Sequence, residues 1–89
     1  MRAVVTVTGK DNKGIIAKVS TFLSEKGANI EDISQTILGE YFAMIMIVDI
    51  TSVSEELSAL AEQCAELGKQ IGMSIYVQHE DIFNAMHNV

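Results

Sequence analysis

The sequence has 89 residues, of which 48% are hydrophobic and 20% are charged, a balance typical of a globular fold and too apolar for a disordered chain. Its formal net charge of -6 disfavours binding to nucleic acid and to anionic membrane surfaces, so neither is expected as a partner. A chain of this length fits a single domain over residues 1–89, with its core in 3–78. Because such a core is small, we expect a subunit interface in a homodimer or higher homo-oligomer.

Compartment and membrane association are predicted from a few simple features. The lone cysteine, Cys64, excludes a disulfide within the chain. The chain opens directly on a strand-like run, without the charged leader and apolar segment of a secretion signal. Its longest apolar run, around residues 42–48, is far shorter than the roughly 20 residues that span a bilayer. A cytoplasmic location without membrane association is therefore expected.

Residues 3–8 are rich in β-branched side chains and predict a first strand, with Val5 and Val7 facing the core. The polar, glycine-bounded segment 9–14 that follows marks a strand-to-helix loop.

Apolar residues then recur at three- and four-residue steps over 14–26, which predicts an amphipathic helix. Asp11 or Asn12 is expected to cap its start, because short polar side chains accept hydrogen bonds from the free amides there. Gly27 is expected to stop it.

Two further strands are predicted by the next 22 residues. Residues 29–38 carry charge at Glu31 and Asp32 and predict an edge strand with an irregularity. The turn at 39–40 leads into 41–50, which is apolar on both faces and should lie centrally in the sheet.

The second helix is predicted from a capping-box pattern over 52–55, in which Ser52 and Glu55 would satisfy the first free amides. Gly72 ends this helix, and Gly68 weakens its last turn. Its apolar face consists of Leu57, Leu60, Ala61, Cys64, Leu67 and Ile71.

A last strand over 73–78 places Ile75 and Val77 on one side. The tail over 80–88 carries apolar residues at helical steps and predicts a short docked helix, with Ile82, Phe83 and Met86 on one face.

The order strand, helix, strand, strand, helix, strand predicts an α+β fold of the ferredoxin-like type: an antiparallel sheet of four strands, two helices on one face, and a short C-terminal helix. The two helices cannot cover the other sheet face. The residues expected to line that half-apolar surface are Val4, Thr6, Met44 or Ile45, Ser74 and Tyr76.

Residues 9–38 resemble the first half of an ACT domain. The resemblance rests on the Asp11-x-x-Gly14 step, the apolar helix ending at Gly27, and Asn29-Ile30 at the start of the second strand. The chain end, Ile82-Phe83-x-Ala85-Met86, and the total length resemble one-domain ACT proteins without an attached enzyme. The resemblance implies a regulatory, amino-acid-sensing module whose ligand binds between paired domains.

The first loop is the main candidate site, because free amides at a helix start, including those of Gly14 and Ile15, attract a carboxylate. Asp11 could accept hydrogen bonds from an α-ammonium group, or it could simply cap the helix while Gly14 packs against the sheet. The resemblance implies that Asn29 reaches the ligand from the paired subunit, although the bare residue also suits a turn. The predicted ligand-binding residues are Lys10, Asp11, Asn12, Gly14, Ile15 and Asn29.

Other reactive residues predict no chemistry. His79 and His87 lack the spacing of a metal site, and Cys64 sits in an apolar helix stripe where a thiol stays protonated. Because the sequence pairs no nucleophile with a base, neither an enzyme nor a cofactor is expected. The alternative to a ligand-binding regulator is a protein-interaction adaptor that uses the exposed edge strand or the uncovered sheet face.

Overall fold

The structure is a computed structural model that describes residues 1–10 and 13–87. All strand pairings in its four-stranded sheet are antiparallel, in the order β2-β3-β1-β4. The expected α+β ferredoxin-like fold is therefore confirmed. The strands are β1 (Arg2–Lys10), β2 (Asn29–Leu38), β3 (Tyr41–Asp49) and β4 (Met73–His79), and the helices are α1 (Ile15–Glu25), α2 (Leu57–Ile71) and α3 (Glu80–His87).

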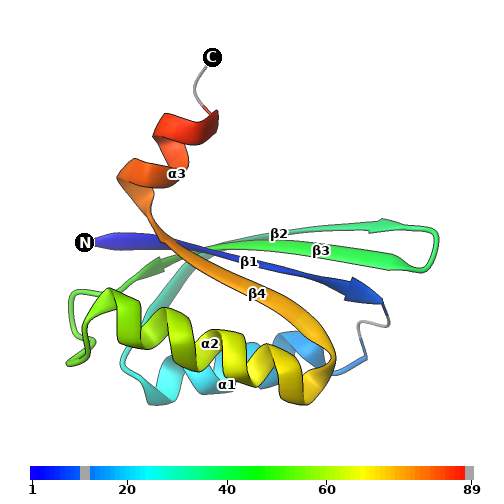
Figure 1. Cartoon of the computed structure of the whole chain (residues 1–89), viewed down its shortest axis with the longest axis horizontal. Helices are drawn as coiled ribbons and strands as arrows, with labels where there is room; N and C mark the ends of the chain where they lie inside the picture. The colour runs from blue at the N-terminus through cyan, green and yellow to red at the C-terminus, as the bar shows by residue number, and fades with distance from the viewer. Residues whose placement is uncertain (11–12, 88–89) are drawn as a thin grey trace.

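The helices lie on different sides of the sheet. Figure 1 shows α1 and α2 together against one face, while α3 rises from the opposite side at the end of β4. We call the side turned away from α1 and α2 the open face. Thr6, Ile45 and Tyr76 share a row across it, because Thr6 is the register partner of both others.

The core lies between the sheet and the two helices α1 and α2. Strand residues alternate between the two faces, so every second residue is buried there over 3–7 of β1 and over 42–48 of β3. Val5 and Val7 are fully buried, as predicted. The largest fully buried side chains are Leu23, Met44, Met46, Leu60, Val5, Val7, Val19, Val48 and Cys64. The sequence predicted either Met44 or Ile45 on the open face. Met44 is buried, so Ile45 is the residue that faces the open side.

The edge and centre of the sheet follow the sequence prediction. β2 is an edge strand, and its register with β3 shifts between Ile30 and Asp32, which confirms the expected irregularity. β3 lies between β2 and β1. The turn joins Leu38 directly to Tyr41, its register partner, so the tight hairpin is also confirmed.

The start of α2 differs from the prediction. The helix begins at Leu57, with Glu56 in the capping position and no side-chain hydrogen bond there, so the predicted capping box does not form. Glu55 lies 3.2 Å from the ammonium group of Lys26 and accepts a hydrogen bond from Gln63. These tertiary contacts occupy the carboxylate that the local pattern assigned to the helix start.

Gly68 has a packing role that the sequence did not indicate. It is buried, and a Cβ placed on it would lie 2.5 Å from the carbonyl oxygen of Met73. The missing side chain therefore lets α2 approach β4 closely. Gly72 ends the helix in the left-handed region, with φ 73°, as predicted.

The tail forms a helix, but much of its apolar surface stays exposed. Ile82 and Met86 of α3 are 55% and 65% exposed. The helix is fixed to the open face by a hydrogen bond from Gln78 Nε2 to Met86 Sδ, of 3.3 Å, and by Arg2, which lies 2.6 Å from Glu80. Among the described residues, no helix combines the length and apolarity needed to cross a bilayer.

Candidate functional site

Among the residues that the structure describes, none caps the start of α1 with its side chain. Gly14 occupies the capping position with φ 73° and forms no side-chain hydrogen bond, while its carbonyl oxygen accepts the amide of Lys18 at 3.1 Å. Asp11 and Asn12, which were predicted to cap this helix, lie outside the described part of the chain. The first amides of α1 point their partial positive charge away from the helix.

Gly14 is needed for its backbone conformation and not for close packing. A Cβ placed on it would meet no atom of the described residues within 4 Å, and these include the whole sheet, so the alternative that it packs against the sheet is wrong. Its positive φ favours glycine, since other residues are strained in that region. The next residue, Ile15, is buried, so only its backbone is available to a ligand.

Lys10 ends β1 and is held at the hairpin. Its ammonium group lies 3.4 Å from Glu40 Oε1 and 5.4 Å from the centre of the Tyr41 ring. The side chain therefore stands at the strand end that leads into the first loop. Glu40 offsets its charge, so an anionic group near the first loop would share this ammonium group with that carboxylate.

Asn29 lies at the opposite end of the sheet. Its register partner is Asp49, which in turn pairs with Arg2, whereas Lys10 pairs with Tyr41. Eight residue steps along β1 separate the two ends, which at about 3.3 Å per residue is roughly 26 Å. One chain therefore does not bring Asn29 together with Lys10 or Gly14.

A pocket of about 400 Å³ lies beside Lys10 at the hairpin end of the sheet. Leu38 and Tyr41, which flank the turn, are 75% and 56% exposed and form part of its wall. Sequence reasoning missed this pocket, although two large apolar residues flanking a two-residue turn were a usable signal. Its remaining lining is Thr8, Gly9, Thr36, Phe42 and Ala43.

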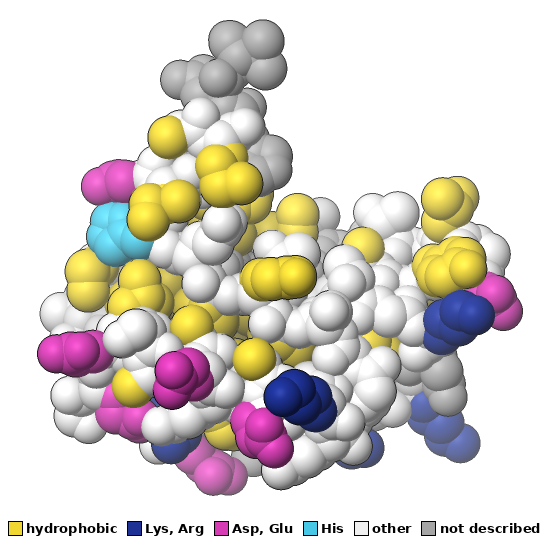
Figure 2. All heavy atoms as spheres, in the orientation of Figure 1, with side chains coloured by type: hydrophobic (Ala, Val, Ile, Leu, Met, Phe, Trp, Pro, Cys, Tyr) yellow, Lys and Arg dark blue, Asp and Glu magenta, His cyan; other side chains and the backbone are white. Residues whose placement is uncertain are grey.

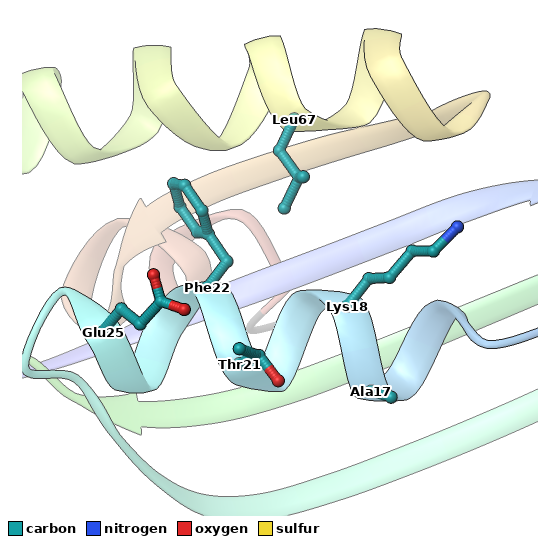
Figure 3. A pocket seen from close by; sticks show the side chains of 6 residues that line it. All are labelled: Ala17, Lys18, Thr21, Phe22, Glu25 and Leu67. Atoms are coloured by element: carbon teal, nitrogen blue, oxygen red, sulfur yellow. The ribbon is translucent and has the colours of Figure 1, made fainter.

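A second groove, of about 410 Å³, lies between α1 and α2. Figure 3 shows Phe22 and Leu67 pointing toward one another from the two helices, with Lys18 and Glu25 at either end of the α1 wall. Lys10, Gly14, Ile15 and Asn29, the predicted site residues that the structure describes, do not line this groove. It is a surface feature separate from the first loop.

Three titratable groups outside the first loop, Cys64, Asp49 and His79, have surroundings that the structure defines. Burial raises the pKa of the Cys64 thiol to about 11, so it stays protonated at neutral pH. Hydrogen bonds from Thr51 lower the pKa of Asp49. His79 Nδ1 accepts the Asp81 amide at 3.0 Å, and over residues 1–10 and 13–87 no three His, Cys, Asp or Glu side chains gather as metal ligands would.

Comparisons with known proteins agree with this geometry. The ACT domain family model matches residues 2–78. A UPF0237 protein from Methanopyrus kandleri is 49% identical over 88 residues, covering 99% of this chain and 98% of that protein.

Two solved structures share the fold. An ACT domain protein from Streptococcus pneumoniae is 40% identical, with a TM-score of 0.84 and 98% of each chain covered. The regulatory subunit of aspartate kinase from Thermus thermophilus is 27% identical, with a TM-score of 0.63 and 86% of this chain and 50% of that one covered. With a family model matching from the first strand to the end of β4, the chain belongs to the ACT domain family.

Proposed function

We propose that this chain is a non-enzymatic regulatory module that binds a small amino-acid-like ligand as a homodimer. The observation that carries the proposal is the start of α1 at Gly14, whose free amides no described side chain caps, together with the cationic Lys10 at the end of the preceding strand. A carboxylate is the group that free helix amides and a nearby ammonium bind best. The regulatory role of the structurally similar subunit of aspartate kinase supports the proposal.

The ligand would bridge two chains. Its carboxylate would accept hydrogen bonds from the amides of Gly14 and Ile15, and Asp11 would bind its ammonium group. Asn29 would come from the partner subunit, since within one chain it lies at the far end of the sheet. The site needs both copies to be complete, so ligand binding and dimer geometry are linked.

The neighbouring pocket suits the side chain of such a ligand. Its volume of about 400 Å³ and its lining by Leu38, Tyr41 and Ala43 favour an apolar group of moderate size. We also propose a cytoplasmic location, which the free thiol of Cys64 supports, because unpaired thiols are usual in reducing compartments.

Calorimetry against each of the proteinogenic amino acids at millimolar concentration tests the proposal. At least one should bind, and Asn29→Ala should weaken it at least tenfold. Gln35→Ala is the matched control, because it removes an exposed side-chain amide from the same strand and should leave affinity unchanged. The absence of binding by every amino acid would contradict the proposal.

A second candidate function, an adaptor that binds another protein by strand addition, is favoured by β2. Nine of its ten residues are exposed, including the apolar Ile33 and Ile37 on the side of the helices. An exposed edge strand offers unpaired amides and carbonyls to an added strand. The adaptor predicts slowed amide exchange along β2 in a stoichiometric complex, and an unoccupied first loop in the presence of amino acids.

A further inference from the structure

The middle of the open face carries almost no charge. Three consecutive rows of register partners cross it, and the central row runs from Ser34 through Ile45 and Thr6 to Tyr76. Of the twelve residues in these rows, only Asp32, at the β2 edge, is charged. The two flanking rows are Asp32, Ile47, Val4, Gln78 and Thr36, Ala43, Thr8, Ser74.

Such a charge-poor area is unusual on a chain in which 20% of residues are charged. Depletion of charged residues, with exposed aromatic and aliphatic side chains, is the composition of an interface centre. Tyr76 is 67% exposed and Ile45 is 40% exposed in the central row. Figure 2 shows the same contrast, with charged side chains gathered below the sheet and at its ends, and few in the hollow between α3 and the hairpin.

α3 forms one wall of this hollow. It rises from the open face, as Figure 1 shows, and exposes Ile82 and Met86. Val4, beneath it on the open face, is only 3% exposed although it lies outside the main core cluster. α3 therefore contacts β1 and β4 while Ile82 and Met86 remain uncovered.

We propose that a second copy of this chain packs its open face against this one, around a two-fold axis parallel to the central row. This assigns a surface to the homodimer of the proposed function and rests on that homodimer. The axis reverses the strand direction between copies. Ile45, Thr6 and Tyr76 of the two copies meet at the centre, and α3 of each copy meets the Lys10 end of the other.

The dimensions suit a pair of stacked sheets. Four strands about 4.8 Å apart and nine residues long give a face of roughly 19 by 30 Å, on the order of 600 Å² before α3 is added. A stable dimer buries about 800 Å² per partner. Stacked sheets lie about 10 Å apart, and a helix of eight residues is about 12 Å long, so α3 spans the gap.

Two open faces can pack with their strand directions reversed or with their strand directions the same, and charge decides between these arrangements. The α3 end carries the carboxylates of Asp49, Glu80 and Asp81, of which Asp81 has the most exposed side chain, at 85%. Arg2 and the amino terminus offset part of this charge. At the other end Lys10 is paired with Glu40, so this pair carries no net charge. The reversed pairing brings this neutral pair to the acidic end, whereas the alternative would oppose two acidic ends.

Sedimentation equilibrium of the full chain tests the surface. The wild type should dimerise in the micromolar range, and Tyr76→Glu should raise the dimer dissociation constant at least about 100-fold, because each dimer would then bury two unpaired carboxylates. Ile37→Glu is the matched control, with an exposed apolar residue on the other side of the sheet, and should leave the constant unchanged. A monomer at millimolar concentration, or a dimer broken by Ile37→Glu alone, would overturn the proposal.

A cross-linking measurement checks the orientation without relying on a destabilised interface. On a Cys64→Ser background, a chain with Met86→Cys mixed with a chain with Thr8→Cys should give heterodimers with a short bis-maleimide. Met86→Cys alone should give few. Strong cross-linking of Met86→Cys to itself would overturn the reversed pairing. Amino-acid binding is read separately, so an open-face dimer that binds no amino acid leaves the surface standing and contradicts only the ligand proposal.

Discussion

The two faces of the sheet use neighbouring residues in opposite ways. On the helix-covered face, Met44 and Met46 are fully buried under α1 and α2, and Gly68 leaves no spare room between α2 and β4. On the open face, Ile45 sits between the two methionines in sequence and remains partly exposed. The same strand therefore supplies fully buried core residues on one side and a partly exposed apolar surface on the other.

The two faces therefore contribute unequally to stability. Burial on the helix-covered face supplies most of the folding free energy of so small a chain. The open face and the strand ends contribute less to folding, and they hold the charge-poor rows, the pocket and the first loop. Substitutions on the two faces should accordingly differ in what they change.

The largest expected effect is the difference in the free energy of unfolding between Met46→Ala and Ile45→Ala. Met46→Ala should lower the free energy of unfolding by about 2–5 kcal/mol, because it leaves a cavity in the core. Ile45→Ala should cost about 1 kcal/mol at protein concentrations where the chain is monomeric, since the side chain is 40% exposed. Urea denaturation measures the free energy of unfolding of both variants. Equal losses of stability in the two would contradict the division between a buried face and an open face.

Gly68→Ala tests how closely α2 packs against β4. The added methyl group would meet a backbone oxygen, which cannot rotate away, so α2 must shift from β4 at a cost of about 1–3 kcal/mol. Ser58→Ala, at an exposed position of the same helix, is the control and should change stability by less than about 0.5 kcal/mol. If Gly68→Ala left the stability unchanged, α2 would have room to move away from β4.

The buried thiol of Cys64, on the helix-covered side of the sheet, makes the stability depend on pH. The folded thiol has its pKa raised to about 11 from 9.0, so between these values the unfolded chain loses its proton while the folded chain keeps it. Stability contributed by the neutral thiol is therefore present below pH 9 and is lost as the pH rises toward 11. Urea denaturation across this range should show a steeper decline for the wild type than for Cys64→Ser.

Thiol labelling provides the matching readout for the open face. Cys64 should react with a disulfide reagent only as fast as the chain opens. Tyr76→Cys on a Cys64→Ser background should react at the rate of a free thiol when the chain is monomeric. Rapid labelling of Cys64 in the folded protein would contradict its burial.

The smallest expected effect concerns the attachment of α3. Arg2→Ala removes the contacts with Glu80 and Glu31, both partly exposed, so the denaturation midpoint should move only slightly, and less still at high salt. Amide exchange within α3 should nevertheless speed up, because the helix loses an anchor. Unchanged exchange there would indicate that Met86 and Gln78 hold the helix without Arg2.

Much of the fold could be predicted because burial follows a simple period. Alternation placed Val5 and Val7 in the core, and the glycines at 27 and 72 ended the helices where expected. The predicted capping box failed for a tertiary reason, since Lys26 and Gln63 claim the Glu55 carboxylate. A local pattern cannot show such competition.

The site could be predicted only in part. Gly14 was selected for free amides at a helix start, and the structure places it directly before the first residue of α1. The pocket near Lys10, in contrast, depends on how the hairpin ends meet β1. The direction of α3 was also beyond the sequence, because its apolar pattern predicts a helix without saying which surface it leaves exposed. These features depend on contacts between segments far apart in the chain.

The central claim is tested most directly by titrating the ¹⁵N-labelled protein with each amino acid and following the amides of Gly14, Ile15 and Asn29. The account predicts that at least one amino acid shifts all three signals with the same saturation curve, because the ligand joins the first loop of one copy to Asn29 of the other. Saturable shifts confined to residues elsewhere, or none with any amino acid at millimolar concentration, would contradict it.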